Sequence, residues 1–181
     1  MHHPKLSYDQ LLEAHIQRLS SLIGDKDYKG QQLRIYGDTS DMVKPWAKRM
    51  DALDTVRDGS DPKEKKKSGY WLNEVYISPK RGRIIPVVLY PFPLKRKGFK
   101  SKTSVILDGI EMAYRATGNK GVWIADREYD NKRVLERLID DKRGFVIRAR
   151  IDPEVSRDIR DERGKKRRLS TVAWNTKMKY H

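Results

Sequence analysis

Apolar residues recur every three or four positions in several stretches of the chain, and this spacing places them on one face of a helix. The predicted helices span residues 7–23, 41–54, 101–116 and 130–141. Ser7 stands at the start of the first helix as a candidate N-cap, and Asp130 or Asn131 can cap the last. Pro45 falls early in the second helix, where its missing amide proton costs little.

Other stretches predict strands, because short alternating or continuous apolar runs are bounded there by turn residues. They span residues 33–38, 70–78, 83–91, 121–126 and 144–150. The sequence PKRG at 79–82 predicts a hairpin between the second and third strands. Pro86 lies within the third strand and cannot donate a ladder hydrogen bond, so we expect that strand at an edge of the sheet.

This order of elements predicts an α/β fold. Three strands in succession form an antiparallel meander, and the following helix, strand, helix and strand complete a mixed sheet with helices on both faces. A right-handed crossover brings strand 121–126 beside strand 33–38. These strands end on Asp126 and Asp38, so we expect both carboxylates at the carboxyl edge of neighbouring parallel strands, where α/β sheets place ligands.

The charge of the chain points to a polyanionic partner. Its 181 residues carry 40 Lys and Arg against 25 Asp and Glu, a formal net charge of +15. Clustered cations bind phosphates with release of counterions, which favours nucleic acid. No basic amphipathic helix, signal peptide or membrane-spanning apolar run is visible, so we expect a cytoplasmic protein without a membrane partner. The absence of cysteine excludes disulfides and thiolate metal sites.

Two neighbouring carboxylates repel each other unless a cation lies between them. Carboxylate oxygens suit Mg²⁺ or Mn²⁺, and two such ions about 3.5–4 Å apart can promote phosphodiester cleavage. Structural roles compete with this interpretation, because a strand-end aspartate is often a helix cap. Glu128 points the same way or is a solvated loop residue, whereas Asp41 and Asp58 suit a cap and a turn. The basic run at 163–168 is a phosphate contact or a solvated tail.

Three blocks in order resemble the catalytic core of DDE transposases of bacterial insertion sequences. They are YGDTSDMVKPWAKRMDALDTVRDGS, GYWLNEVYISP and VWIADREYDNKRVLERLIDDKRGFVIRAR, within residues 33–150. The closer likeness is to the cut-and-paste branch with a tyrosine–arginine–glutamate signature. The resemblance implies an RNase H-like fold and metal-dependent DNA strand cleavage and transfer at transposon ends. The protein would then act on double-stranded DNA in the bacterial cytoplasm, associated with the nucleoid.

The same resemblance implies roles for particular residues. Asp38 and Asp126 would hold Mg²⁺ or Mn²⁺ as two catalytic carboxylates, while Trp123 belongs to the core. The residues expected to meet DNA phosphates are Arg127, Lys165, Lys166, Arg167 and Arg168.

The third acid of the signature has no counterpart in this chain. Tyr129 is followed by Lys132 where the signature has arginine, and neither Glu154 nor Glu162 has a tyrosine at the required spacing. We therefore expect a helical segment at 1–30, a partial core at 31–150 and the truncated start of a basic β-rich insertion at 151–181. Such a fragment should bind metal weakly, catalyse little strand transfer and leave apolar sheet surface open to self-association.

Two other functions remain open at this point. The chain could hold DNA without catalysis, as an inactive transposase remnant. Alternatively, it could be a different RNase H-like metal-dependent nuclease whose third carboxylate is local, with Glu128 or Asp41 in that role.

Overall fold

The computed structural model describes residues 7–24, 33–47, 49–57, 63, 65–80, 83–151, 157–160 and 163–171. The chain divides into two compact units, Met1–Ile147 and Arg148–His181. Each unit is described by itself.

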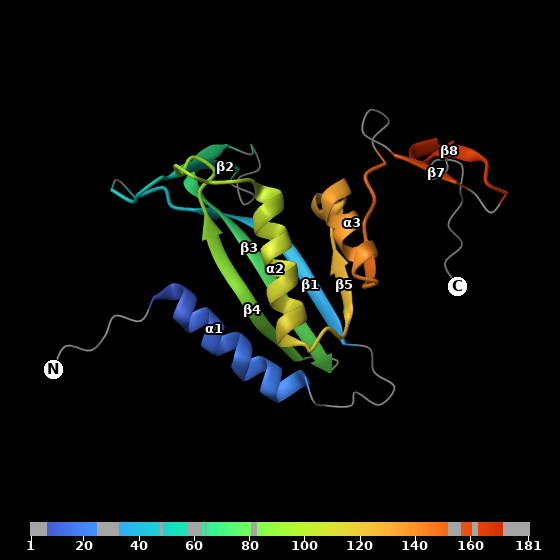
Figure 1. Cartoon of the computed structure of the whole chain (residues 1–181). Helices are drawn as coiled ribbons and strands as arrows, with labels where there is room; N and C mark the ends of the chain where they lie inside the picture. Colours follow the sequence, from blue (N-terminus) through green and yellow to red (C-terminus); the bar gives the residue numbers. More distant parts are fainter. Residues whose placement is uncertain are drawn as a thin grey trace. The chain divides into compact units, whose positions relative to one another are not determined.

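Among its described residues, the first unit holds three α-helices, two short turns of other helix types and a six-stranded sheet (Figure 1). The helical elements are α1 (Tyr8–Leu19), the π-helical turn η1 (Ser20–Gly24), α2 (Lys102–Ala116), the 3-10 turn η2 (Arg127–Tyr129) and α3 (Lys132–Asp140). The strands are β1 (Arg34–Val43), β2 (Asp54–Arg57), β3 (Lys66–Lys80), β4 (Arg83–Phe92), β5 (Val122–Ala125) and β6 (Gly144–Ile147).

Polar side chains cap the helices where the sequence predicts. Ser7 Oγ accepts a hydrogen bond from the amide of Gln10 at 3.2 Å, and the Gln10 side chain accepts one from the Ser7 amide at 2.9 Å. This reciprocal pair is a capping box. At α3 the cap is Asn131 rather than Asp130, since Asn131 Oδ1 accepts from the amide of Arg133.

The strand order confirms the predicted mixed sheet. The order is β2-β3-β1-β5-β6, with β4 also paired to β3. β1 and β4 run antiparallel to β3, whereas β5 runs parallel to both β1 and β6. The crossover prediction is therefore confirmed: the strand after α2 returns beside β1. Among the described strands β4 pairs only with β3, so Pro86 lies on an edge strand as expected.

The helix predicted over residues 41–54 is wrong. β1 continues to Val43, because β3 is long enough to pair with it as far as Gly69. After a turn, the chain enters β2 at Asp54 on the other side of β3. Asp41 is therefore a strand residue and not a helix cap. Asp58 lies outside the described residues. Pairing with a distant strand overrides the local helical spacing.

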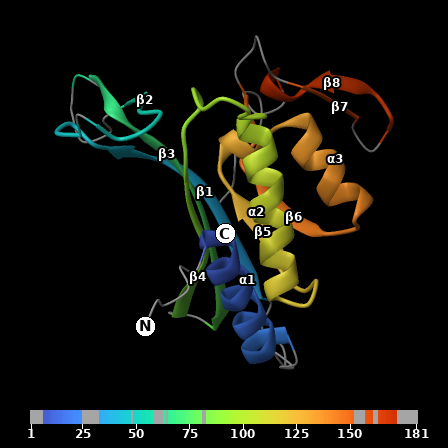
Figure 2. The ribbon, with the colours of Figure 1, turned by 60° about the vertical axis from the view of Figure 1, so that its left-hand side comes forward.

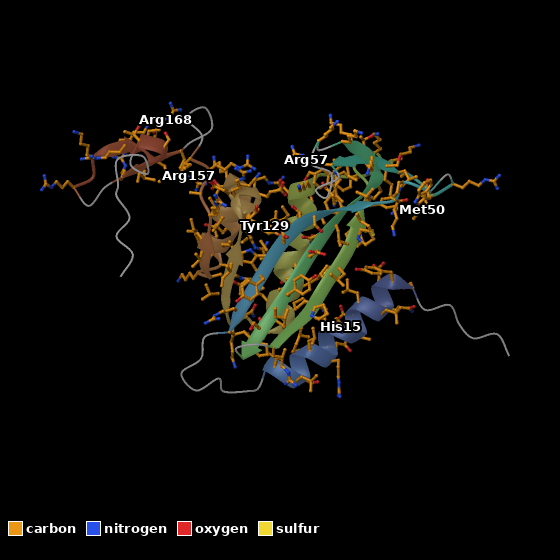
Figure 3. All side chains as sticks on the ribbon, turned by 180° about the vertical axis from the view of Figure 1, so that it is seen from behind. His15, Met50, Arg57, Tyr129, Arg157 and Arg168 are labelled. Atoms are coloured by element: carbon orange, nitrogen blue, oxygen red, sulfur yellow. The ribbon has the colours of Figure 1, made fainter. Side chains whose placement is uncertain are left out.

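All three helices of the first unit pack on the same face of the sheet, which corrects the expectation of helices on both faces. α2 lies on the side of Val75, because a Cβ on Gly109 would contact the Val75 side chain at 3.1 Å. α1 and α3 flank α2 on that side and share its buried cluster (Figure 2). Seen from behind, the strands lie in front of α2 (Figure 3).

The opposite face of the sheet carries exposed apolar side chains. Ile84, Leu89 and Val146 are 66%, 46% and 63% exposed. On β4, Ile84 and Leu89 alternate with Ile85 and Val88 of the helix-covered face, and on β6 Val146 lies between Phe145 and Ile147 of that face. No described helix of the first unit covers them, which agrees with the expectation of uncovered apolar sheet surface.

The second unit contains a short antiparallel hairpin of β7 (Asp158–Arg160) and β8 (Lys166–Arg168). Part of the basic run therefore forms a strand. Lys166 Nζ lies 2.8 Å from Asp158 Oδ2, so this cation is engaged within the hairpin. Within the part of the chain that the structure describes, no helix is long and apolar enough to cross a membrane.

Candidate active site

The parallel pairing of β1 and β5 places Asp38 beside Asp126, at the carboxyl end of β5. Gly37 is level with Ala125 in the register. Asp38 and Asp126 are the next residues along the two chains, and the backbone of Asp126 is still extended, so they follow neighbouring strands about 4.8 Å apart. Asp126 follows the last residue of β5, whereas β1 continues past Asp38 in pairing with β3. The sequence placed both aspartates at strand ends, and only Asp126 is at one.

Each aspartate uses one carboxylate oxygen locally and leaves the other available. Asp38 Oδ1 accepts from the amide of Thr39, and Asp126 Oδ1 accepts from the amide of Glu128, both at 2.8 Å. Among the described residues, no donor contacts the second oxygen of either carboxylate, and both side chains are exposed. Two available carboxylate oxygens fit Mg²⁺, which binds one or two carboxylates and completes its shell with water and phosphate oxygens.

Aromatic rings support this pair of aspartates from the core side. Trp123 and Tyr129 are fully buried, with ring centres 5.8 Å apart, so Trp123 is a core residue as predicted. The Tyr129 hydroxyl donates to the carbonyl of Asp38 at 3.3 Å. Gly37 allows this packing, because a Cβ there would overlap the Trp123 ring. The position of Asp38 therefore depends on a close contact between backbone and rings.

The pKa of Tyr129 is raised well above its ordinary value of 10.0. Burial is the main cause, because it desolvates the phenolate. The negative charges of Asp38, Asp126, Glu128 and Glu74 add to the effect. The hydroxyl therefore stays protonated and serves as a hydrogen-bond donor to Asp38.

Glu128 does not join Asp38. Its Oε2 accepts from the Thr39 hydroxyl and lies 2.6 Å from Lys102 Nζ. Asp38 and Thr39 are successive strand residues, so their side chains lie on opposite faces of the sheet. Glu128 therefore lies on the helix-covered side, paired with a cation, and is poorly placed as a third ligand beside Asp38.

Asp41 lies near Lys102, the cation that pairs with Glu128. Its pKa is raised, chiefly because burial disfavours the charged form, while the positive charge of Lys102 opposes that shift and Glu128 adds to it. Its Oδ1 is buried without a hydrogen-bond partner among the described residues. Like Thr39, it alternates onto the face opposite Asp38. Neither local acid considered from the sequence shares the face of Asp38.

Sequence reasoning missed Glu74. It stands directly opposite Asp38 in the antiparallel register of β1 and β3, so these two like charges face each other. The pKa of Tyr76 is raised mainly by burial and also by the nearby carboxylate of Glu74. The alternation in YWLNEVYIS gave Glu74 an outward position, but only the pairing register could set it across from Asp38.

The predicted cationic residues fall in both units. Arg127 follows Asp126 directly in η2, and its side chain is exposed. The second unit contains Lys165, Lys166, Arg167 and Arg168, all exposed on or beside β8. The structure thus places one predicted phosphate contact beside the aspartates.

A pocket of about 530 Å³ lies elsewhere in the first unit. It is lined by α1, β3, β4, the 96–101 loop and α2, with Tyr8, Tyr90 and Phe99 among its walls. Neither Asp38 nor Asp126 lines it. Both aspartates are exposed, and an exposed pair suits a large substrate better than a small enclosed one.

No protein-family model matches the chain, and no curated protein matches it. Within the described ranges, no three or more His, Cys, Asp or Glu side chains form a group able to hold a metal ion. The candidate site consists of the Asp38 and Asp126 pair.

Proposed function

We propose that residues 33–150 form a DDE transposase core, RNase H-like in fold, which acts on DNA phosphodiesters at Asp38 and Asp126. The observation that carries the proposal is the parallel pairing of β1 and β5, because it makes neighbours of two aspartates 88 positions apart, counted from 38 to 126. The net charge of +15 supports a DNA partner.

In this proposal the chain supplies binding and orientation. Asp38 and Asp126 would hold Mg²⁺ or Mn²⁺ through their available oxygens, and Arg127 would contact a DNA phosphate. The metal, when bound, would stabilise negative charge developing on the phosphate oxygens. Tyr129 keeps Asp38 in place from the core side. The 181-residue sequence has no glutamate in the tyrosine–arginine–glutamate spacing, so we expect little strand transfer by this polypeptide alone.

Binding of DNA without catalysis is the alternative that the charge favours. The third alternative, a nuclease with Glu128 or Asp41 as a local third carboxylate, is disfavoured by their position on the opposite face. Asp38→Ala separates the nuclease from the other two alternatives. The transposase core and the binding module both retain DNA affinity in this variant, whereas the nuclease loses a measurable hydrolysis activity.

The metal site itself is tested by iron-directed backbone cleavage. Purified protein is incubated with Fe²⁺, ascorbate and peroxide, and the fragments are mapped by mass spectrometry. We expect cuts near residues 38 and 126, suppressed by excess Mg²⁺ and lost in Asp38→Asn and Asp126→Asn. The matched control is Asp9→Asn, an exposed aspartate on α1, which should leave the cuts unchanged.

Scattered cuts that ignore Mg²⁺ and both site variants would contradict metal binding by this pair. Readily detected Mg²⁺-dependent cleavage of transposon-end DNA by the chain alone would contradict the expected lack of strand transfer.

A further inference from the structure

Trp46 has an exposed indole at the turn where a helix was expected. Its side chain is 90% exposed, whereas Trp123 is fully buried and the Trp71 ring lies under Lys102 Nζ at 4.1 Å. Trp174 lies outside the described residues. An aromatic side chain in a core typically buries about 150–250 Å² of its surface, and the exposed Trp46 indole does not. Trp46 therefore contributes little to the stability of this fold and is available to a partner.

The loop that carries Trp46 is held at both ends. This 44–53 loop, of which Lys48 lies outside the described residues, joins β1 to β2, which flank β3 on its two sides. The Lys44 amide donates to the Ser68 carbonyl at 2.7 Å, and the Tyr70 hydroxyl donates to the Asp51 carbonyl at 2.5 Å. Between these points the Ala47 amide closes a turn onto the Lys44 carbonyl at 3.1 Å. Trp46 is thus presented on a backbone with defined anchors.

Further contacts hold the end of the loop that leads into β2. Asp54, the first residue of β2, is buried, and its Oδ2 accepts from the amide of Leu94 at 3.0 Å. Lys95 Nζ lies 3.5 Å from Asp54 Oδ1. The segment after β4 therefore holds the second end of the loop. Figure 3 shows Met50 near the outer end of the loop, well away from Tyr129.

Exposed cations lie on the loop and on the two strands, β2 and β3, at its base. Arg49 is exposed on the loop, and Arg57 on β2 stands opposite Lys66 on β3. Lys65 and Lys66 are exposed on the neighbouring strand segment. An aromatic platform with cations beside it is the combination that binds single-stranded nucleic acid, because bases stack on the ring while phosphates meet the charges.

We propose that the 44–53 loop binds unpaired nucleotides, with one base stacked on Trp46 and the adjoining phosphates held by Arg49, Arg57 and Lys66. An anionic membrane fits less well, since Trp46 and Met50 offer little apolar area for insertion. A second copy of the chain fits less well too, because its charge of +15 opposes association. The inference does not depend on metal binding by Asp38 and Asp126.

The test compares single-stranded and duplex DNA in buffer with EDTA. The full chain is titrated into fluorescein-labelled dT12 and into a duplex of equal length, and anisotropy is recorded at several salt concentrations. Trp46→Ala should weaken dT12 binding about 5- to 150-fold, the range expected for loss of one stacked base, and leave duplex binding within about twofold. Trp46→Phe should retain most of the affinity for dT12. Unlabelled dT12 should quench a fluorescence component that is absent from Trp46→Ala.

Arg49→Ala is the matched control on the same loop. It should weaken both DNA forms and lower the salt dependence of binding, whereas Trp46→Ala leaves that salt dependence unchanged. Circular dichroism should show both variants folded. The inference is overturned if Trp46→Ala binds dT12 like the parent or weakens both DNA forms equally. It is also overturned if the indole responds to phosphatidylserine vesicles and not to dT12.

Because EDTA removes divalent metal ions, binding of dT12 in this buffer does not depend on a metal at Asp38 and Asp126. If Trp46→Ala binds dT12 like the parent while the iron-directed cuts at residues 38 and 126 are present, only the loop proposal fails. If Trp46→Ala weakens dT12 binding selectively while those cuts are absent, only the metal site fails.

Discussion

The ammonium of Lys102, the first residue of α2, lies 2.6 Å from Oε2 of Glu128 in η2. The same ammonium lies 4.1 Å from the centre of the Trp71 ring. This pair determines which acids are available at the carboxyl end of β5. It engages Glu128 on the helix-covered side and leaves Asp38 and Asp126 as the neighbouring carboxylates with an available oxygen.

The pair between Lys102 and Glu128 should contribute measurably to stability. Both side chains are partly exposed, at 28% and 37%, so solvent screens much of their attraction. We expect Lys102→Met to lower the free energy of unfolding by about 1 kcal/mol, measured by urea denaturation. The same substitution at Lys132, which is 86% exposed and 3.6 Å from Glu136, should change it by less than about 0.5 kcal/mol. Equal losses of unfolding free energy in Lys102→Met and Lys132→Met would show that the pair of Lys102 and Glu128 stabilises the fold no more than an exposed ion pair.

Gly37 should not tolerate a side chain. A Cβ there would overlap the Trp123 ring and lie 2.9 Å from Tyr129 Cζ, and both rings are fully buried. Gly37→Ala should therefore lower the free energy of unfolding by about 2–3 kcal/mol. Gly144→Ala is the control, because its Cβ would lie 3.3 Å from Val122 Cγ2 at an exposed position. That variant should remain within about 1 kcal/mol of the parent in thermal or urea unfolding. A stable Gly37→Ala variant would refute the packing described around Gly37.

Tyr129 should make the protein less stable in alkali. Its pKa is raised in the folded state, first by burial and then by nearby carboxylates including Asp38. Above about pH 10 the unfolded tyrosine loses its proton while the folded one keeps it, so the unfolded state binds fewer protons. The free energy of unfolding should then fall by about 1.4 kcal/mol per pH unit from this group, an effect absent below pH 10.

Tyr129→Phe isolates that contribution. It removes the ionisable group and the hydroxyl contacts to Asp38 and Asn73, which are long at 3.3 and 3.4 Å. We expect a constant loss of about 1 kcal/mol at neutral pH and a shallower decline above pH 10 than in the parent. Urea unfolding from pH 8 to 11 supplies both curves. Parallel curves throughout would show that Tyr129 ionises equally in the folded and unfolded states.

Local signals in the sequence determined most of the elements. The caps Ser7 and Asn131, the apolar spacing of α2 and α3, and the Pro86 strand all follow from interactions within a few residues. The parallel placement of β5 beside β1 also followed, because crossover handedness restricts the topology. These features predicted that Asp38 and Asp126 are neighbours.

Only the tertiary structure decided the rest. Residues 41–43 form a strand because β3 is long enough to pair with them. The residues around 41–43 do not encode the length of β3, so local sequence could not predict this pairing. The face of Glu128 depends on its contacts with Thr39 and Lys102, which come from separate elements. Glu74 faces Asp38 only through the β1–β3 register. Periodicity determines which side of an element is apolar, whereas long-range pairing determines what each side meets.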